Sequence, residues 1–190
     1  IAVAEKLGAG VAKALLGKAA VPDDLPFVTG SVGWLGTSAS NRMMERCDTL
    51  LMAGSGFTYP EFLPKPGQAR GVQIDINPGM LSRRYPMEVP LTGDSAATLR
   101  ALLPRLKERG DTAWRQEIEQ GVRAWWAEAD DRAELPATPI NPRRLFYALS
   151  ARLPDNVVLT ADSGTGTVWS AREVRLRRGM SFSVSGTLAT

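Results

Sequence analysis

The chain is organised around residues 30–37, which read GSVGWLGT and lead through the helix-like SASNRMMER to the apolar run TLLMA at residues 49–53. Glycines let a backbone approach a ligand closely, and the start of the following helix offers free N–H groups to an anion. A second apolar run, GVQID at residues 71–75, ends in an acid. This order predicts a parallel α/β sheet that binds a nucleotide-like ligand at its strand ends.

Outward from this stretch, short apolar runs alternate with helical patterns along the chain. The runs predict strands at residues 11–16, 49–53, 71–76, 89–91, 157–161 and 180–184. Asp94 is expected to cap a helix that kinks or ends early at Pro104, and Asn141 with Pro142 marks another sharp helix start. Residues 111–130 carry tryptophan and aliphatic side chains at helical spacing, which predicts a long helix.

The composition narrows the classes of function. The net charge of +3 is small and the basic residues do not cluster, which argues against nucleic-acid binding. No apolar run approaches the length of a membrane span. The single cysteine, Cys47, fits a reducing, cytoplasmic location. The absence of histidine excludes catalytic triads and histidine–metal sites within these residues, so we assign no catalytic residue and no metal ligand here.

Three loops at expected strand ends are candidates for ligand binding. The first contains Gly30, Gly33 and Gly36, whose spacing matches neither the dinucleotide fingerprint nor a P-loop. The second places Gly54 and Ser55 near an acid on the next strand, and the third combines residues 162–167 with 186–190. For each loop the alternative is a turn that binds nothing. The tryptophans of the long helix predict packing rather than a cofactor box.

Proline-rich residues 132–142 have the composition of a linker. We therefore expect a domain over residues 1–131, a linker at 132–140 and a second domain that starts at residue 141. The chain begins inside a helical pattern and stops inside a loop, so we expect a fragment of a longer protein.

The ordered series of loops resembles the thiamine-diphosphate-dependent enzymes, in particular the pyruvate oxidase and acetolactate synthase group. Residues 29–37, 43–57 and 73–76 are similar to the middle domain of that family. Residues 160–164 with Trp169 are similar to its Asp-Val-Gly…Trp stretch, and residues 185–190 to its glycine-rich stretch near the aminopyrimidine. The resemblance implies a Rossmann-like parallel sheet flanked by helices that lacks its first strand. The first βα elements of a truncated C-terminal α/β domain follow this sheet.

The resemblance also implies site residues. Those along thiamine diphosphate would be Asp162, Gly164, Thr165, Gly166, Gly186, Thr187 and Leu188. Those along FAD or another nucleotide, in flavin-binding members, would be Gly33, Gly36, Thr37, Gly54, Ser55 and Asp75. The sequence departs from the family at residues 55–59, where acetolactate synthases carry Arg-Phe-Asp-Asp-Arg, and at Ser163, where valine is usual.

The implied function is decarboxylation of a pyruvate-like 2-oxo acid, with transfer or oxidation of the resulting carbanion equivalent. The full enzyme would bind thiamine diphosphate and Mg²⁺, act as a lyase, transferase or oxidoreductase, and form a homodimer or homotetramer. Because the family's glutamate-bearing domain and metal motif fall outside these residues, the fragment alone is expected to be inactive. Two alternatives stay open: a non-catalytic adenine-nucleotide-binding module, and a structural or oligomerisation module.

Overall fold

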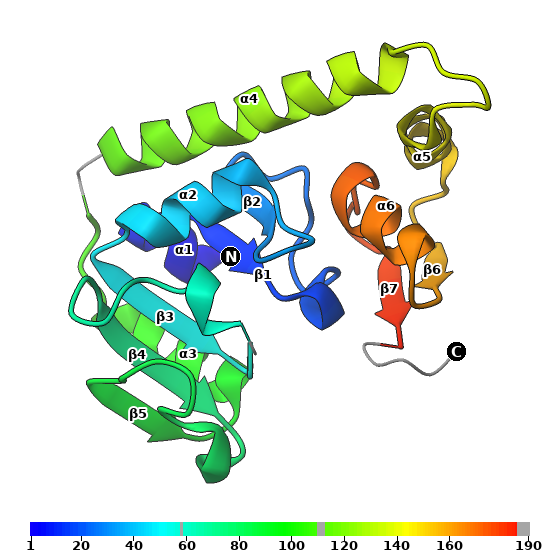
Figure 1. Ribbon diagram of the computed structural model, residues 1–190. Helices are drawn as coiled ribbons and strands as arrows, with labels where there is room; N and C mark the ends of the chain where they lie inside the picture. The colour runs from blue at the N-terminus through cyan, green and yellow to red at the C-terminus, as the bar shows by residue number, and fades with distance from the viewer. Residues whose placement is uncertain (58, 110–112, 186–190) are drawn as a thin grey trace. The chain divides into compact units, whose positions relative to one another are not determined.

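A computed structural model describes residues 1–57, 59–109 and 113–185 (Figure 1). The chain divides into two compact units, residues 1–9 with 41–112 and residues 10–40 with 113–190. Helix α2 (Ser38–Arg46) carries the chain from the second unit into the first. Both units pair parallel strands and surround them with helices, so the predicted α/β class with parallel sheets is confirmed.

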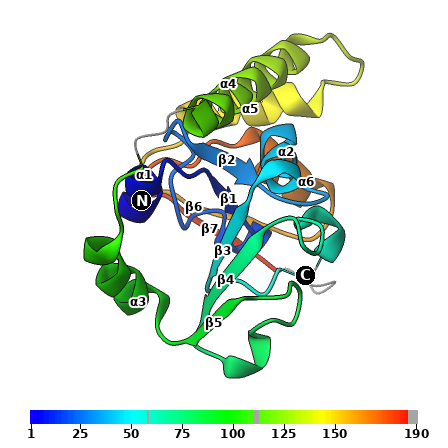
Figure 2. The same cartoon turned by 90° about the vertical axis from the view of Figure 1, so that its left-hand side faces the viewer.

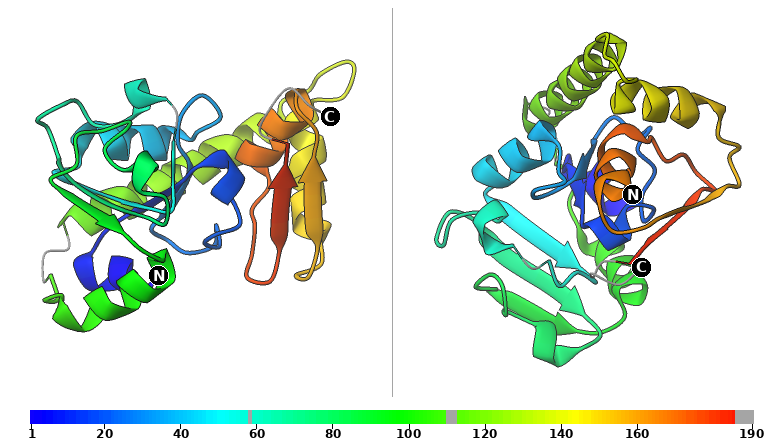
Figure 3. Two further views of the ribbon diagram at one scale, coloured as in Figure 1. Left: turned by 90° about the horizontal axis from the view of Figure 1, so that it is seen from below. Right: turned by 45° about the vertical axis from the view of Figure 1, so that its right-hand side comes forward.

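The first unit is built on a three-stranded parallel sheet in the order β3 (Thr49–Ala53), β4 (Arg70–Asp75) and β5 (Val89–Thr92). Helices α1 (Ala2–Leu7) and α3 (Ser95–Leu102) lie side by side on one face of this sheet (Figure 3), and Lys6 Nζ donates a hydrogen bond to Leu103 O at 3.2 Å. The short 3₁₀ turns are η2 (Pro60–Phe62), η3 (Pro78–Met80) and η4 (Leu103–Arg105).

The core of the first unit is an apolar cluster of Leu50, Met52, Leu63 and Tyr85. The Tyr85 hydroxyl donates to Ala69 O at 2.7 Å, which satisfies its polar end while the ring stays buried. This cluster packs β3 against the connections that precede and follow β4.

The second unit contains two separate parallel pairs of strands. Strand β1 (Val11–Lys13) pairs with β2 (Val28–Ser31), and β6 (Val158–Ala161) pairs with β7 (Ser181–Val184). Three helices accompany them: α4 (Ala113–Glu134), α5 (Pro142–Arg152), which packs against α4 (Figure 2), and α6 (Thr165–Glu173).

Arginine–tryptophan contacts link the helices of the second unit. The guanidinium of Arg175 lies 4.1 Å from the ring centroid of Trp126, and that of Arg172 lies 5.2 Å from the centroid of Trp125. Cation–π contacts of this kind are favourable when partly desolvated. The tryptophans of α4 thus have a packing role, as the helical spacing predicts.

Most predicted elements appear within one or two residues of their expected bounds. One difference is the run at 11–16, where β1 ends at Lys13 and Leu15–Gly17 forms the 3₁₀ turn η1. The strand ends there because the Lys13 side chain takes part in a buried ion cluster. The Gly17 N–H then donates a hydrogen bond to Ala14 O at 2.9 Å, which closes the 3₁₀ turn. Helix α4 also extends to Glu134, beyond the expected end at 130, while 111 and 112 lie outside the described residues. The domain borders at 131 and 141 stay a prediction.

The thiol of Cys47 is partly buried after α2, and burial raises its pKa to about 11. Because an unperturbed cysteine thiol has a pKa of 9.0, the thiolate fraction at pH 8 is about 100-fold lower in the folded chain. We expect a disulfide reagent such as DTNB to modify Cys47 at least about tenfold more slowly at pH 8 than in 6 M guanidinium chloride, where the thiol regains its ordinary pKa. Equal rates in both solvents would contradict this expectation.

None of the described helices combines the length and apolar character needed to cross a membrane.

Candidate functional site

The loop between β6 and α6 and the first turn of α6 together carry four of the predicted cofactor residues, at the carboxyl end of a parallel pair of strands. Asp162, Gly164, Thr165 and Gly166 are all exposed there. No side chain caps the N-terminus of α6, where Gly164 adopts a φ of 124°. A Cβ added at Gly164 or Gly166 would meet no atom of the described residues within 4 Å. The loop therefore leaves an open, small-residue cradle above a helix N-terminus, which is the arrangement that favours a phosphate group.

Hydrogen bonds within residues 162–167 stabilise the conformation of this cradle. The Ser163 N–H donates to Asp162 Oδ1 at 2.8 Å, and the buried Thr167 hydroxyl donates to Asp162 O. The Asp162 carboxylate thus serves the turn itself.

The end of β7 reaches the same loop. Ala161 and Val184 are paired in the β6–β7 register, and Ser163 Oγ lies 3.1 Å from Ser185 Oγ. The other three predicted residues of this site, Gly186, Thr187 and Leu188, lie outside the described part of the chain. The chain order places them directly after Ser185.

The glycine loop that follows β2 closes on itself. Thr37 N–H donates to Ser31 O at 3.0 Å, and Gly36 N–H donates to Gly33 O at 2.8 Å. The Thr37 side chain caps α2 by accepting the Ser40 N–H at 3.0 Å. A Cβ at Gly36 would lie 2.7 Å from backbone atoms of both Gly33 and Ser31, so close packing of the loop already requires glycine at this position.

One polar atom under this loop lacks a partner. Ser31 is 1% exposed, and its Oγ makes no hydrogen bond to any residue that the structure describes. A buried hydroxyl without a partner is rare and calls for an explanation such as a ligand or an ordered water.

The remaining nucleotide candidates lie in the first unit, at the carboxyl edge of the β3–β4–β5 sheet. Gly54 and Ser55 directly follow β3, and Gly54 has a φ of 59°. Asp75 is the last residue of β4, and its Oδ1 accepts the Asn77 N–H at 2.9 Å. The turn-forming role considered for Asp75 is therefore present, and a ribose-binding role stays a prediction.

Sequence reasoning missed a buried ion cluster in the second unit, formed by Lys13, Lys18 and Asp23. Their exposures are 4%, 1% and 4%. Lys13 Nζ lies 2.7 Å from Asp23 Oδ1, and Lys18 Nζ lies 3.2 Å from Asp23 Oδ2. The signal available was two lysines within an otherwise apolar stretch that ends at an acid.

The charges of this cluster depend on one another. Burial lowers the pKa of Lys13, and Asp23 partly offsets that effect. Burial alone would raise the pKa of Asp23, but Lys18 and Lys13 together hold it below its ordinary value. Among the described residues, Asp23 is the only carboxylate that forms an ion pair with Lys13 or Lys18.

A second buried acid, Glu173, ends helix α6. Burial raises its pKa, which the guanidinium of Arg143, with Nη1 at 2.8 Å from Oε1, partly offsets. This pair joins α5 to α6. It lies at the C-terminal end of α6, whereas residues 162–166 lie at the N-terminal end. We assign it a structural role.

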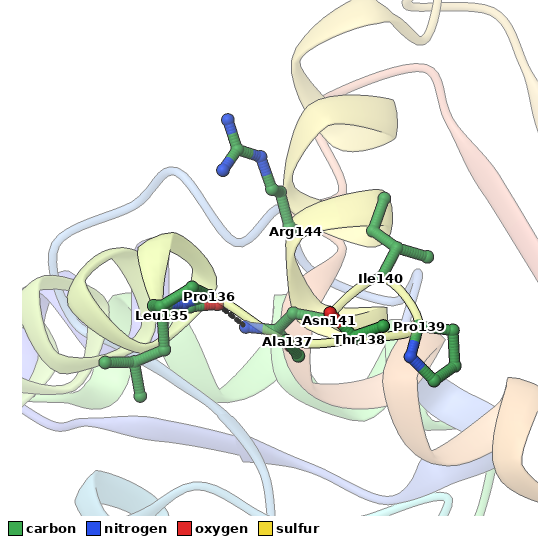
Figure 4. A pocket seen from close by; sticks show the side chains of 8 residues that line it. All are labelled: Leu135, Pro136, Ala137, Thr138, Pro139, Ile140, Asn141 and Arg144. Atoms are coloured by element: carbon green, nitrogen blue, oxygen red, sulfur yellow. Dashed lines mark hydrogen bonds between the residues drawn. The ribbon is translucent and has the colours of Figure 1, made fainter.

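A shallow hollow lies at the α4–α5 connection, lined by residues 135–141 and Arg144 (Figure 4). None of the predicted site residues lines it. The Asn141 amide spans the connection by donating to Leu135 O at 3.1 Å while its Oδ1 accepts the Arg143 N–H at 3.0 Å. Asn141 thus closes one helix and starts the next, and the hollow follows from that turn.

Across residues 1–57, 59–109 and 113–185 there is no group of three or more Asp, Glu, Cys or His side chains placed to hold a metal ion. At the β6–α6 loop, the described residues offer backbone N–H groups and hydroxyls to a bound molecule.

Comparison with known proteins points to one family. The family described as "Thiamine pyrophosphate enzyme, central domain" matches residues 1–102. The protein YdaP of Bacillus subtilis (strain 168), whose name describes it as thiamine pyrophosphate-containing, is 34% identical over 187 residues, which are 98% of this chain and 32% of that protein.

Two further relatives carry the names of defined enzymes. The acetolactate synthase isozyme 2 large subunit of Escherichia coli (strain K12) is 30% identical over 93% of this chain and 31% of its own length. The pyruvate oxidase of Lactiplantibacillus plantarum is 24% identical over 91% of this chain and 29% of its own length. The chain thus spans about a third of the length of the curated relatives that it matches.

Proposed function

Because the chain belongs to the thiamine pyrophosphate enzyme family, we propose that it is part of an enzyme that decarboxylates a pyruvate-like 2-oxo acid and transfers or oxidises the resulting carbanion equivalent. The relatives named acetolactate synthase and pyruvate oxidase support this class of reaction. Bound thiamine diphosphate supplies the electron sink for decarboxylation, and the protein supplies position and electrostatics.

The observation that carries the proposal is the open cradle at residues 162–166. The N-terminus of α6 has no side-chain cap, and no atom of the part of the chain that the structure describes lies within 4 Å of a Cβ built at Gly164 or Gly166. The diphosphate fits this place because helix N–H groups donate to phosphate oxygens and the helix dipole favours negative charge. The stretch 186–188 would lie along the pyrimidine, and Mg²⁺ would be held by the diphosphate together with residues beyond this chain.

We expect Gly166→Ala to abolish thiamine diphosphate binding while the fold remains intact. The new methyl group would have no atom of the described residues within 4 Å, and alanine is favoured over glycine within a helix by about 1 kcal/mol, so stability should stay equal or rise. The same methyl group would occupy the space that the proposal gives to the diphosphate. Isothermal titration of the full-length protein with thiamine diphosphate and MgCl₂ measures the affinity, and thermal unfolding measures the stability.

Gly17→Ala is the matched control, because a Cβ there also meets nothing within 4 Å and the site lies on η1. It should leave cofactor affinity unchanged. Wild-type affinity in the Gly166→Ala protein would contradict a diphosphate at this loop. Decarboxylation of pyruvate by the 190-residue chain alone would contradict the expected inactivity of the fragment.

A nucleotide, FAD in the flavin-binding case, is the second candidate ligand, at Gly33–Thr37 and at Gly54, Ser55 and Asp75. The unpartnered Ser31 hydroxyl under the glycine loop favours it. Titration with FAD and with ADP separates a flavoprotein, a non-catalytic adenine-nucleotide module and a purely structural domain. Light scattering tests the proposed homodimer or homotetramer.

A further inference from the structure

Residues 15–23 pack against residues 174–182 within the second unit. Leu15 and Ala19 pack against the buried cluster of Val174, Leu176, Met180 and Phe182. This apolar contact joins the segment after β1 to the segment that leads into β7. Apolar packing alone is non-directional, so it does not by itself fix where the chain sits along the contact.

Asp23 adds direction to this contact. Its backbone N–H donates to Leu176 O at 2.7 Å, and its Oδ2 accepts the Leu176 N–H at 2.9 Å. Both backbone groups of Leu176 are thus held by a single residue. The carboxylate is in turn fixed by two donors, Lys13 and Lys18, and so holds Leu176 in place.

Leu176 leads to the candidate cofactor site. Strand β7 starts five residues later at Ser181, and its register with β6 runs from Val158↔Ser181 to Ala161↔Val184. The end of β7 then meets the β6–α6 loop where Ser163 Oγ and Ser185 Oγ are 3.1 Å apart. A shift of Leu176 along the chain direction would change this register, and with it the loop.

We propose that Asp23 is a positioning residue for the loop at residues 162–166, acting through Leu176 and β7. This inference rests on the proposed function, since the loop is the suggested diphosphate site. Burying two lysines and one aspartate is a poor source of stability, because apolar replacements of similar volume are often as stable. A role in fixing register explains why polar groups occupy this place.

The test compares three variants of the full-length protein. Asp23→Asn removes the charge. The triple variant Lys13→Met/Asp23→Leu/Lys18→Met replaces the cluster by apolar groups of similar volume and should restore the unfolding midpoint. Asp155→Asn is the control, since its carboxylate pairs with Arg177 in the same unit but is 75% exposed. Hydrogen exchange of peptides from residues 158–166 and 176–185, thiamine diphosphate affinity with Mg²⁺ and thermal unfolding are measured for each.

In Asp23→Asn and in the triple variant we expect faster hydrogen exchange in both peptides. We also expect the affinity for thiamine diphosphate to be about ten- to a hundredfold weaker in both variants. This loss of affinity corresponds to the free energy of one lost hydrogen bond to a charged group. Peptides from β3–β5 should exchange as in the wild type. A triple variant that recovers stability, exchange and affinity together overturns the proposal, because the cluster would then only stabilise the fold. Unchanged affinity in Asp23→Asn overturns it as well.

The two proposals fail in different ways. If the wild-type protein binds no thiamine diphosphate, the proposed function fails. The exchange data then decide the positioning role alone, and unchanged exchange at residues 158–166 in the triple variant overturns it.

Discussion

Replacing Asp23 by alanine is expected to lower the free energy of unfolding of the second unit by about 3–5 kcal/mol, the cost of leaving a buried charge without its partner. Two ammonium groups at 2.7 and 3.2 Å would lose their carboxylate, and the Leu176 N–H would lose its acceptor. Urea denaturation of the 190-residue chain followed by tryptophan fluorescence measures the change. The probe is selective, because all five tryptophans lie in residues 10–40 and 113–190.

Asp155→Ala provides the comparison for this measurement. Asp155 also pairs with an arginine at 2.7 Å, but its side chain is 75% exposed. Exposed pairs contribute about 0–1 kcal/mol, so the control should stay within that range. A loss of similar size in both variants would contradict the role given to the buried cluster.

The effect of Asp23 should depend on pH in a defined direction. The lysines hold the pKa of Asp23 below its unfolded value, which is about 3.9 for aspartate. A group with a lowered pKa in the folded state contributes stability that is present above the unfolded pKa and is lost as the pH falls through the folded one. The difference in free energy of unfolding between wild type and Asp23→Asn should therefore be largest near pH 7 and should shrink as the solution is acidified below pH 4. A difference that stays constant from pH 7 to pH 2 would rule out this assignment.

Much of the fold follows from local signals in the sequence. The helix starts after the glycine-rich stretch at 30–37 and at Asn141–Pro142 each depend on one or two residues, and the structure confirms both. The loop is shorter than that stretch, because Gly30 and Ser31 belong to β2. Short apolar runs correctly predict the positions of β1, β3, β4, β5, β6 and β7, but they do not predict β2 (Val28–Ser31), in which Val28 is the only large apolar residue. Signals of this kind are local, so they can be read without knowing the partner.

The buried cluster could not be predicted in the same way. Lysines are usually exposed, and the burial of these two goes with long-range contacts such as that between Asp23 and Leu176, which are 153 residues apart. The separation of the β1–β2 and β6–β7 pairs from the β3–β4–β5 sheet is likewise a matter of long-range pairing. Among the site residues, the β6–α6 loop lies at a strand end as predicted. The contacts of Gly36 and Asp75 give these residues structural roles that the sequence left open beside ligand binding.

Gly36→Ala should destabilise the second unit by about 1–3 kcal/mol, because overpacking at a rigid site forces the backbone to move. The added Cβ would lie 2.7 Å from Gly33 N, Gly33 O and Ser31 O, which are all backbone atoms that cannot rotate away. Opening the loop would also strain the bond from Thr37 N–H to Ser31 O, and so displace the cap of α2. Urea denaturation with tryptophan fluorescence again measures the loss.

Gly17→Ala separates this steric effect from the general effect of adding a methyl group. No atom lies within 4 Å of a Cβ at residue 17, so its stability should change by less than about 0.5 kcal/mol. If FAD or ADP binds at the glycine loop, Gly36→Ala should also weaken that binding, whereas Gly17→Ala should not. Stability and binding can thus be compared in the same pair of proteins. An unchanged stability in Gly36→Ala would mean that the loop can open without cost, and its glycine would then have to be explained by a ligand rather than by packing.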